Sequence, residues 1–223
     1  MLTLFLIAAV VWFRQPSPIV RHGTTPVVPQ GCFPGIGQKI KTLNPGEGGY
    51  LPKHAFYQDE KRDRFVSNWY TRYLHKMNEP SLLVAAHDQS ASYRFLWLRS
   101  FHPTVAVRVW STGESRVLSV KELAREGQSQ SSDLLLDRIR PLNDEEWGAI
   151  VKLVEESCFW SSPPTENEPA AMDGAWWVLE GTQQNYYHVA TRQSPDSGAY
   201  RELGLYLLQL AGLPLDESAG EVY

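Results

Sequence analysis

The residues best suited to chemistry lie in the stretch DGAWWVLEGTQQNYYHVATRQSP, residues 173–195. A carboxylate, Glu180, and an imidazole, His188, stand on either side of the polar segment TQQN, between two apolar runs typical of a β-hairpin. Such a pair can serve as general acid and base if the two groups come within hydrogen-bond reach. Glu180 and His188 are therefore the candidate catalytic residues, although no nucleophile motif accompanies them.

The length of the hairpin loop decides whether these two side chains meet. If the loop is two or four residues long and centred on Gln183-Gln184, Glu180 points to the opposite face from His188 and shares its face with Tyr187. If the loop is residues 183–185, with the asparagine in a left-handed conformation, Glu180 faces His188 directly. In that second register we favour a solvated cross-strand ion pair over an acid–base couple.

Ligand binding is a second possible role for this hairpin. The chain has eight tryptophans, which indicate an aromatic core or, less commonly, a platform for sugars or peptides. The candidate binding residues in the hairpin are Trp176, Tyr187 and Arg192. The six histidines show no ligand spacing and no CxxC or HExxH motif is present, so we expect no metal and no cofactor.

The two cysteines, Cys32 and Cys158, leave two interpretations open. Cys158 follows Trp147, Ile150 and Val154 at helical spacing, which favours a small buried apolar side chain. Alternatively, Cys32 and Cys158 form a disulfide if the chain reaches an oxidising compartment.

The N-terminus carries features of a membrane attachment. Residues 1–13, MLTLFLIAAVVWF, are almost entirely apolar but shorter than the roughly 20 residues of a spanning helix. Residues 14–55 are rich in proline and glycine, which predicts a tether. We favour an anchor that further upstream residues complete and that places the domain outside the cytoplasm. The alternative is a partial anchor with a cytoplasmic domain, because Arg14 and Arg21 would hold the side that follows the apolar run in the cytoplasm.

Periodicity predicts one α+β domain over residues 56–213, followed by a flexible tail, 214–223. Apolar residues at helical spacing predict a helix from Asp59 to Asn78, a second helix after the N-cap Asn143, and a third over residues 197–211. Alternating runs predict a three-stranded meander at 93–101, 104–110 and 115–120. With the hairpin, this gives about five antiparallel strands with about three helices on one face.

Several segments occur in a distinctive order: YRFLWLRSFH (93–102), EEW (145–147), FW (159–160) and LGLYLLQLAGL (203–213), together with the N-terminal stretch and the hairpin. In this order they resemble a group of uncharacterised bacterial proteins. The resemblance implies one compact domain behind an N-terminal hydrophobic segment, and it implies no activity.

These observations predict a membrane-tethered bacterial domain that binds or scaffolds an unknown protein or other component of the cell envelope, without catalysis. The formal net charge of −4 and the absence of a long basic run argue against a nucleic-acid partner. The two alternatives are a hydrolase that uses Glu180 and His188, together with Tyr187 or Arg192, and a soluble cytoplasmic adaptor.

Overall fold

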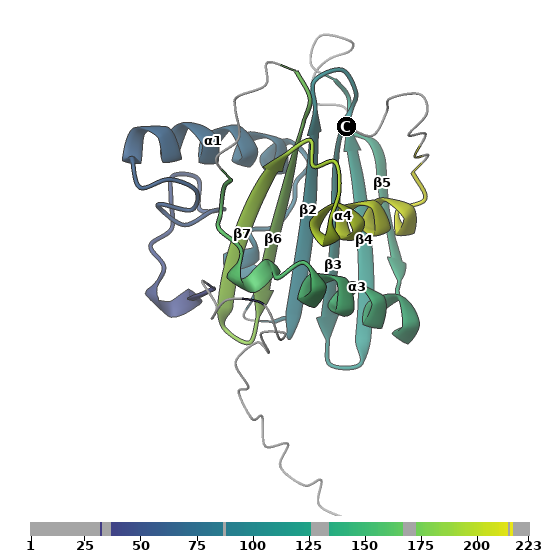
Figure 1. Cartoon of the computed structure of the whole chain (residues 1–223). Coiled ribbons are helices and arrows are strands. Elements are labelled where there is room, and N and C mark those ends of the chain that lie inside the picture. The colour runs from purple at the N-terminus through teal and green to yellow at the C-terminus, as the bar shows by residue number, and fades with distance from the viewer. Residues whose placement is uncertain are drawn as a thin grey trace, which may run out of the picture.

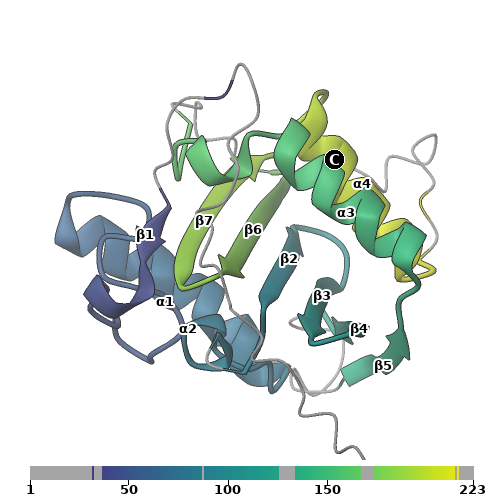
Figure 2. The same cartoon turned by 90° about the horizontal axis from the view of Figure 1, so that it is seen from below.

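A seven-stranded antiparallel sheet organises the chain in the computed structural model, with the strand order β1-β7-β6-β2-β3-β4-β5 (Figures 1 and 2). The structure describes residues 32, 37–86, 88–125, 134–166, 173–213 and 215. Helices cover the two faces of this open sheet, and the fold class is α+β as predicted.

The described residues form seven strands, four α-helices and two 3₁₀ helices. The strands are β1 (Gln38–Lys39), β2 (Ala91–Arg99), β3 (Thr104–Thr112), β4 (Ser115–Leu123), β5 (Leu134–Pro141), β6 (Ala175–Gln183) and β7 (Tyr186–Gln193). The α-helices are α1 (Glu60–Lys76), α2 (Leu82–Ala85), α3 (Asp144–Glu156) and α4 (Ala199–Leu210), and the 3₁₀ helices are η1 (Ile40–Thr42) and η2 (Phe159–Ser161).

Helices α1 and α3 begin where the sequence places capping residues. Asp59 accepts a hydrogen bond from the Arg62 amide at the start of α1. Asn143 and Glu146 form a complete capping box at the start of α3, with Asn143 Oδ1 2.8 Å from the Glu146 amide. These side chains satisfy amides that a helix leaves without partners. All three predicted helices are confirmed, as α1, α3 and α4, with small shifts at their ends.

The helices lie on both faces of the sheet, not on one face as predicted. Helices α3 and α4 cover the face that carries Phe95, Trp97 and Trp177. Helix α1 covers the other face, over Leu96 and Val178. Because the central strands β2 and β3 are buried on both sides, each face has its own cover, and the single cover inferred from the alternation of β3 was wrong.

The sheet also contains two strands that the sequence did not predict. Strand β5, LLLDRIRP, pairs with β4 at the edge of the sheet, and most of its side chains are at least partly exposed. Its leucines and arginines therefore give no clean alternation. Strand β1 lies within the predicted tether and pairs with the start of β7 at Tyr186 and Tyr187.

Residues 37–55 of the predicted tether are packed against the domain. The Gly37 amide donates to the Trp160 carbonyl at 3.1 Å, and the Ile40 amide donates to the Asn185 carbonyl at 2.8 Å. Leu51 is buried in the core beneath α1. The tether and domain boundary predicted at residue 55 was therefore too late, because the Pro/Gly content of this segment serves turns on the protein surface.

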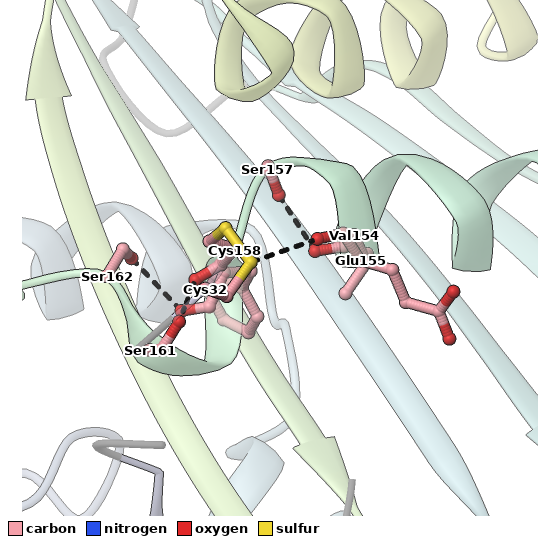
Figure 3. Close-up of a disulfide and its surroundings, with 8 residues drawn as sticks. Cys32, Val154, Glu155, Ser157, Cys158, Ser161 and Ser162 are labelled. Carbon is pink, nitrogen blue, oxygen red and sulfur yellow. Dashed lines mark hydrogen bonds between the residues drawn. A yellow bond between two sulfur atoms is a disulfide. The ribbon is translucent and has the colours of Figure 1, made fainter. Parts of the chain in front are cut away.

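A disulfide joins Cys32 to Cys158, with the two Cα atoms 5.5 Å apart (Figure 3). Cys158 adopts a left-handed conformation, with φ of 49°, at the turn between α3 and η2. Two serine hydroxyls hold this turn: Ser161 Oγ donates to the Cys158 carbonyl at 3.2 Å and Ser162 Oγ donates to the Phe159 carbonyl at 3.0 Å. The disulfide interpretation is thus the one that the structure adopts, over the free buried thiol that the spacing favoured.

Among the residues that the structure describes, no helix combines the length and the apolar character needed to cross a bilayer. The predicted anchor, residues 1–13, and the predicted tail, apart from Leu215, lie outside the described residues.

Candidate functional site

The β6–β7 hairpin has a two-residue loop, which is one of the predicted lengths, but the loop is shifted by one residue along the chain, so the register differs from both predictions. Gln184 and Asn185 form a two-residue turn with positive φ values of 49° and 72°, as in a type I′ hairpin turn. In this register Glu180 lies opposite Val189, and His188 lies opposite Gly181. Successive residues of a strand point to opposite faces, so Glu180 and His188 are on opposite sides of the sheet and do not form the acid–base pair.

His188 lies on the face covered by α3 and η2, where it is 4% exposed. Its ring centroid is 5.0 Å from that of Phe159. Gly181, opposite His188, leaves space for the rings of Phe159 and Tyr93, because a Cβ there would lie 2.7 Å from Phe159 Cε1. Burial lowers the pKa of His188 to about 4, so the imidazole is neutral near pH 7. No hydrogen-bond partner for its Nε2 is found among the described residues. His188 therefore acts as a buried core residue.

Glu180 lies on the opposite face as part of a buried ion pair. Its carboxylate is bound by the Arg94 guanidinium, and the Tyr187 hydroxyl donates to Glu180 Oε1 at 3.1 Å. Burial raises the pKa of the Glu180 carboxyl, while Arg94 acts in the opposite direction. Tyr187 shares a face with Glu180 as the even-length loops predicted.

This ion pair extends into a larger network centred on Glu79, in the connection between α1 and α2. The Glu79 carboxylate lies 2.9 Å from Arg108, 3.5 Å from Lys121 and 3.7 Å from Arg94. Lys121 Nζ also donates to the Met77 carbonyl at 2.8 Å. Three cations from three neighbouring strands thus hold the end of α1 onto the sheet.

The geometry of the network indicates a structural clamp. Its charged side chains are 11% exposed or less, and the two carboxylates and three cations compensate one another at short range. Buried charges need such partners, because desolvation costs several kcal/mol per ion. A substrate would have to displace these internal contacts, so the network is unsuited to catalysis.

The three candidate binding residues are separated by the fold. Tyr187 belongs to the network described above. Arg192 lies on the face covered by α4, where it is 5% exposed, with its Nε 2.6 Å from Glu166 and its guanidinium 5.0 Å from the Tyr200 ring centroid. Trp176 is half-buried and lines an open cleft. Only Trp176 can therefore contact a ligand without a change in the core.

The cleft that contains Trp176 has a volume of about 340 Å³ and lies between α1 and one end of the sheet. Its walls include three aromatic side chains: Trp69 and Tyr73 from α1, and Trp176 from β6. The ring centroids of Trp69 and Trp176 are 6.1 Å apart, with the planes at 88°. Such a perpendicular pair forms a rigid apolar corner. We call this space the aromatic cleft.

Polar groups surround the aromatic corner, and the charged side chains among the described lining residues are all cationic. The remaining lining residues are Leu98, Arg99, Ser100, His102, Thr104, Ala124 and Arg125. No aspartate or glutamate is among these lining residues, although the whole chain has a net charge of −4. Arg72 also lies near the cleft, with Nη2 3.4 Å from the Tyr73 hydroxyl. The aromatic cleft is therefore suited to a ligand with an apolar face and negative charge.

The aromatic cleft and the disulfide lie at opposite ends of the sheet. The residues that line the cleft lie where β2 and β4 end and where β3 and β6 begin. Figure 1 shows these four strand ends at the same end of the sheet. Cys158 precedes η2, which packs beside the start of β7 and close to the hairpin turn. Strands of nine residues separate the two ends, a distance of about 30 Å.

Part of the cleft could be recognised in the sequence and part could not. Trp176 was identified as a candidate because it stands out in the hairpin. Trp69 and Tyr73 appeared only as part of the apolar stripe of α1, since helical spacing does not distinguish a buried ring from one that lines a cleft. Arg125 follows a strand that was expected to end at residue 120, so its position could not be inferred.

Comparisons with known proteins give no assignment. No protein-family model, curated protein or solved structure matches this chain. Among the described residues, no cluster of three or more His, Cys, Asp or Glu side chains could hold a metal ion. Function must therefore be inferred from the cleft, the disulfide and the N-terminal sequence.

Proposed function

We propose that this chain is a membrane-tethered bacterial domain that works outside the cytoplasm and binds a component of the cell envelope without catalysing a reaction. The observation that carries this proposal is the disulfide between Cys32 and Cys158. Disulfides persist in exported proteins and are rare in the reducing cytoplasm. The apolar residues 1–13 then provide the attachment to the membrane.

The position of the disulfide indicates how the aromatic cleft is oriented relative to the membrane attachment. Because Cys32 is joined to the end of the sheet near the hairpin turn, the chain enters the domain there. Residues 14–31 can span at most about 60 Å when fully extended. The aromatic cleft, at the other end of the sheet, then faces away from the point of attachment and toward envelope material within that reach.

The alternatives fit the geometry less well. A hydrolase based on Glu180 and His188 lacks the contact between these groups that general acid–base catalysis needs. A cytoplasmic adaptor leaves the disulfide without an explanation. A binding domain accounts for both the absence of that pair and the presence of an open cleft with half-buried aromatic walls.

Photocrosslinking in intact cells tests the proposal. A benzophenone side chain at the exposed Ser100, in the cleft, should give an adduct in bacteria that express the full chain with its native upstream sequence. The same probe at Glu114, in the turn at the other end of the sheet, serves as the control. We expect the Ser100 adduct to disappear with Trp176→Ala. Equal adducts from both positions, or an adduct that forms only in the cytoplasm, would overturn the proposal.

A further inference from the structure

We infer that the ligand of the aromatic cleft is an acidic oligosaccharide, that is, a glycan whose sugar units carry carboxylate or similar anionic groups. The inference rests on the proposed binding function and names its ligand. Three features of the cleft carry it: the arrangement of the rings, the sign of the charge around them, and the distance of the cleft from the membrane attachment.

The aromatic walls suit the apolar face of a sugar ring. Trp69, Tyr73 and Trp176 are all half-buried, so part of each ring is open to the cleft. The 88° angle between Trp69 and Trp176 allows a bound ring to pack on one aromatic face while it meets the edge of the other. The volume of about 340 Å³ is at the small end for ligand pockets, which suits one or two sugar units of a longer chain.

The polar rim supplies the groups that an acidic substituent requires. Arg125 lines the cleft beside Ala124, and its guanidinium lies 6.0 Å from the Phe101 ring centroid. Arginine binds carboxylates through paired hydrogen bonds. Thr104 also lines the cleft and has a hydroxyl of the kind that bonds sugar oxygens. No carboxylate is among the described residues that line the cleft, so none of these residues repels an anionic sugar.

Two other anionic partners fit less well. A nucleic acid would also stack on the rings, but backbone recognition depends on an extended basic surface, and this chain has a net charge of −4. A phospholipid headgroup offers a charge but no flat apolar ring face for the corner of Trp69 and Trp176, and the cleft lies at the end of the sheet opposite the chain's point of entry. A glycan chain that extends away from the membrane can reach the cleft.

Fluorescence anisotropy with the full chain in detergent tests this inference. The probe is a fluorescein-labelled short oligogalacturonate, and the matched competitor is a neutral galacto-oligosaccharide of the same length. We expect the acidic oligosaccharide to bind at least tenfold more tightly than the neutral one, with binding weakened by salt. Unlabelled single-stranded DNA and anionic phospholipid vesicles should compete poorly.

Variants assign the two parts of the site. Trp176→Ala should weaken the binding of both sugars at least tenfold, because it removes one wall of the aromatic corner. Arg125→Gln should weaken the binding of the acidic sugar only, and so remove the preference for the acidic over the neutral oligosaccharide. The controls are Trp110→Ala, a half-buried tryptophan that contacts Arg108 outside the cleft, and Arg64→Gln on the exposed surface of α1. Circular dichroism and thermal melting establish that each variant is folded.

The possible outcomes distinguish a wrong ligand assignment from a wrong proposed function. Equal affinity for acidic and neutral sugars, or a preference for DNA or vesicles, would overturn the assignment of an acidic oligosaccharide. Failure of the folded chain to bind any saccharide would also overturn it. In either case the crosslinking result from Ser100 would still show whether the cleft binds a partner outside the cytoplasm.

Discussion

Glu180 and His188 lie on opposite faces of one hairpin, because the Gln184-Asn185 turn places Glu180 opposite Val189. A loop one residue longer would have brought the two side chains to the same face. The strand register thus converts an apparent acid–base pair into two unrelated structural residues. Glu180 binds Arg94 beneath α1, while His188 packs against Phe159 on the opposite side.

Replacing Arg94 should strongly destabilise the domain. Arg94→Met leaves the buried Glu180 without its guanidinium partner, and we expect the free energy of unfolding to fall by about 3–5 kcal/mol. Urea denaturation followed by circular dichroism measures the change. The double variant Arg94→Met/Glu180→Leu should be more stable than the single variant, because no unpaired carboxylate remains at that position. Additive losses in the double variant would contradict the clamp interpretation.

The pH dependence of stability should contain a contribution from His188. Its pKa is about 4 in the folded chain, against 6.5 without burial, so the unfolded chain binds more protons between these values. The contribution is fully present above pH 6.5 and is lost as the pH falls toward 4, by up to about 3 kcal/mol. Urea denaturation at a series of pH values should therefore show a steeper loss for the natural chain than for His188→Leu. Parallel curves would show that His188 is not buried as a neutral side chain.

Two glycine substitutions should have opposite effects. A Cβ at Gly204 in α4 would lie 2.6 Å from Trp177 Cε3, so Gly204→Ala should cost about 1–3 kcal/mol of stability. Gly148 in α3 is exposed and has open space around the same position. Gly148→Ala should raise stability by about 1 kcal/mol through helix propensity alone. Thermal unfolding of both variants compares packing with propensity directly, and a stabilised Gly204→Ala would refute the close contact between α4 and β6.

The disulfide should contribute measurably to stability. Cys32 and Cys158 are separated by 126 residues in the sequence, and cross-linking a loop of this length restricts the unfolded chain by up to about 5 kcal/mol. The variant Cys32→Ser/Cys158→Ser should therefore unfold at lower urea concentration than the oxidised chain. A reductant should destabilise the natural chain and leave the double variant unchanged. No difference between the oxidised chain and the double variant would contradict a structural role.

Local signals in the sequence were sufficient for much of the fold. Asp59 and Asn143 begin helices because their side chains accept hydrogen bonds from amides of the first turn. The alternation of Val105, Val107 and Val109 identified a strand with one apolar face toward the core. These features depend on neighbours in the chain, so a single sequence contains them.

Features that depend on distant segments were not predictable. The helices were expected on one face, but α1 lies on the face opposite α3, a choice that depends on which side each connection crosses. Strand β5 is recognisable only through its pairing with β4. The site shows the same division: Trp176 was a candidate from its own sequence context, whereas Trp69 and Arg125 join it only through the fold.

The redox state of the cysteines in living cells tests the central claim most directly. Because the chain has only two cysteines, alkylation by a mass-tagged maleimide reports on one bond. Cells that express the full chain with its native upstream sequence are acid-quenched and alkylated before and after treatment with a reductant. We expect no tag before reduction and two tags afterwards. Two tags without reduction, on folded protein, would show that Cys32 and Cys158 remain thiols and would contradict a function outside the cytoplasm.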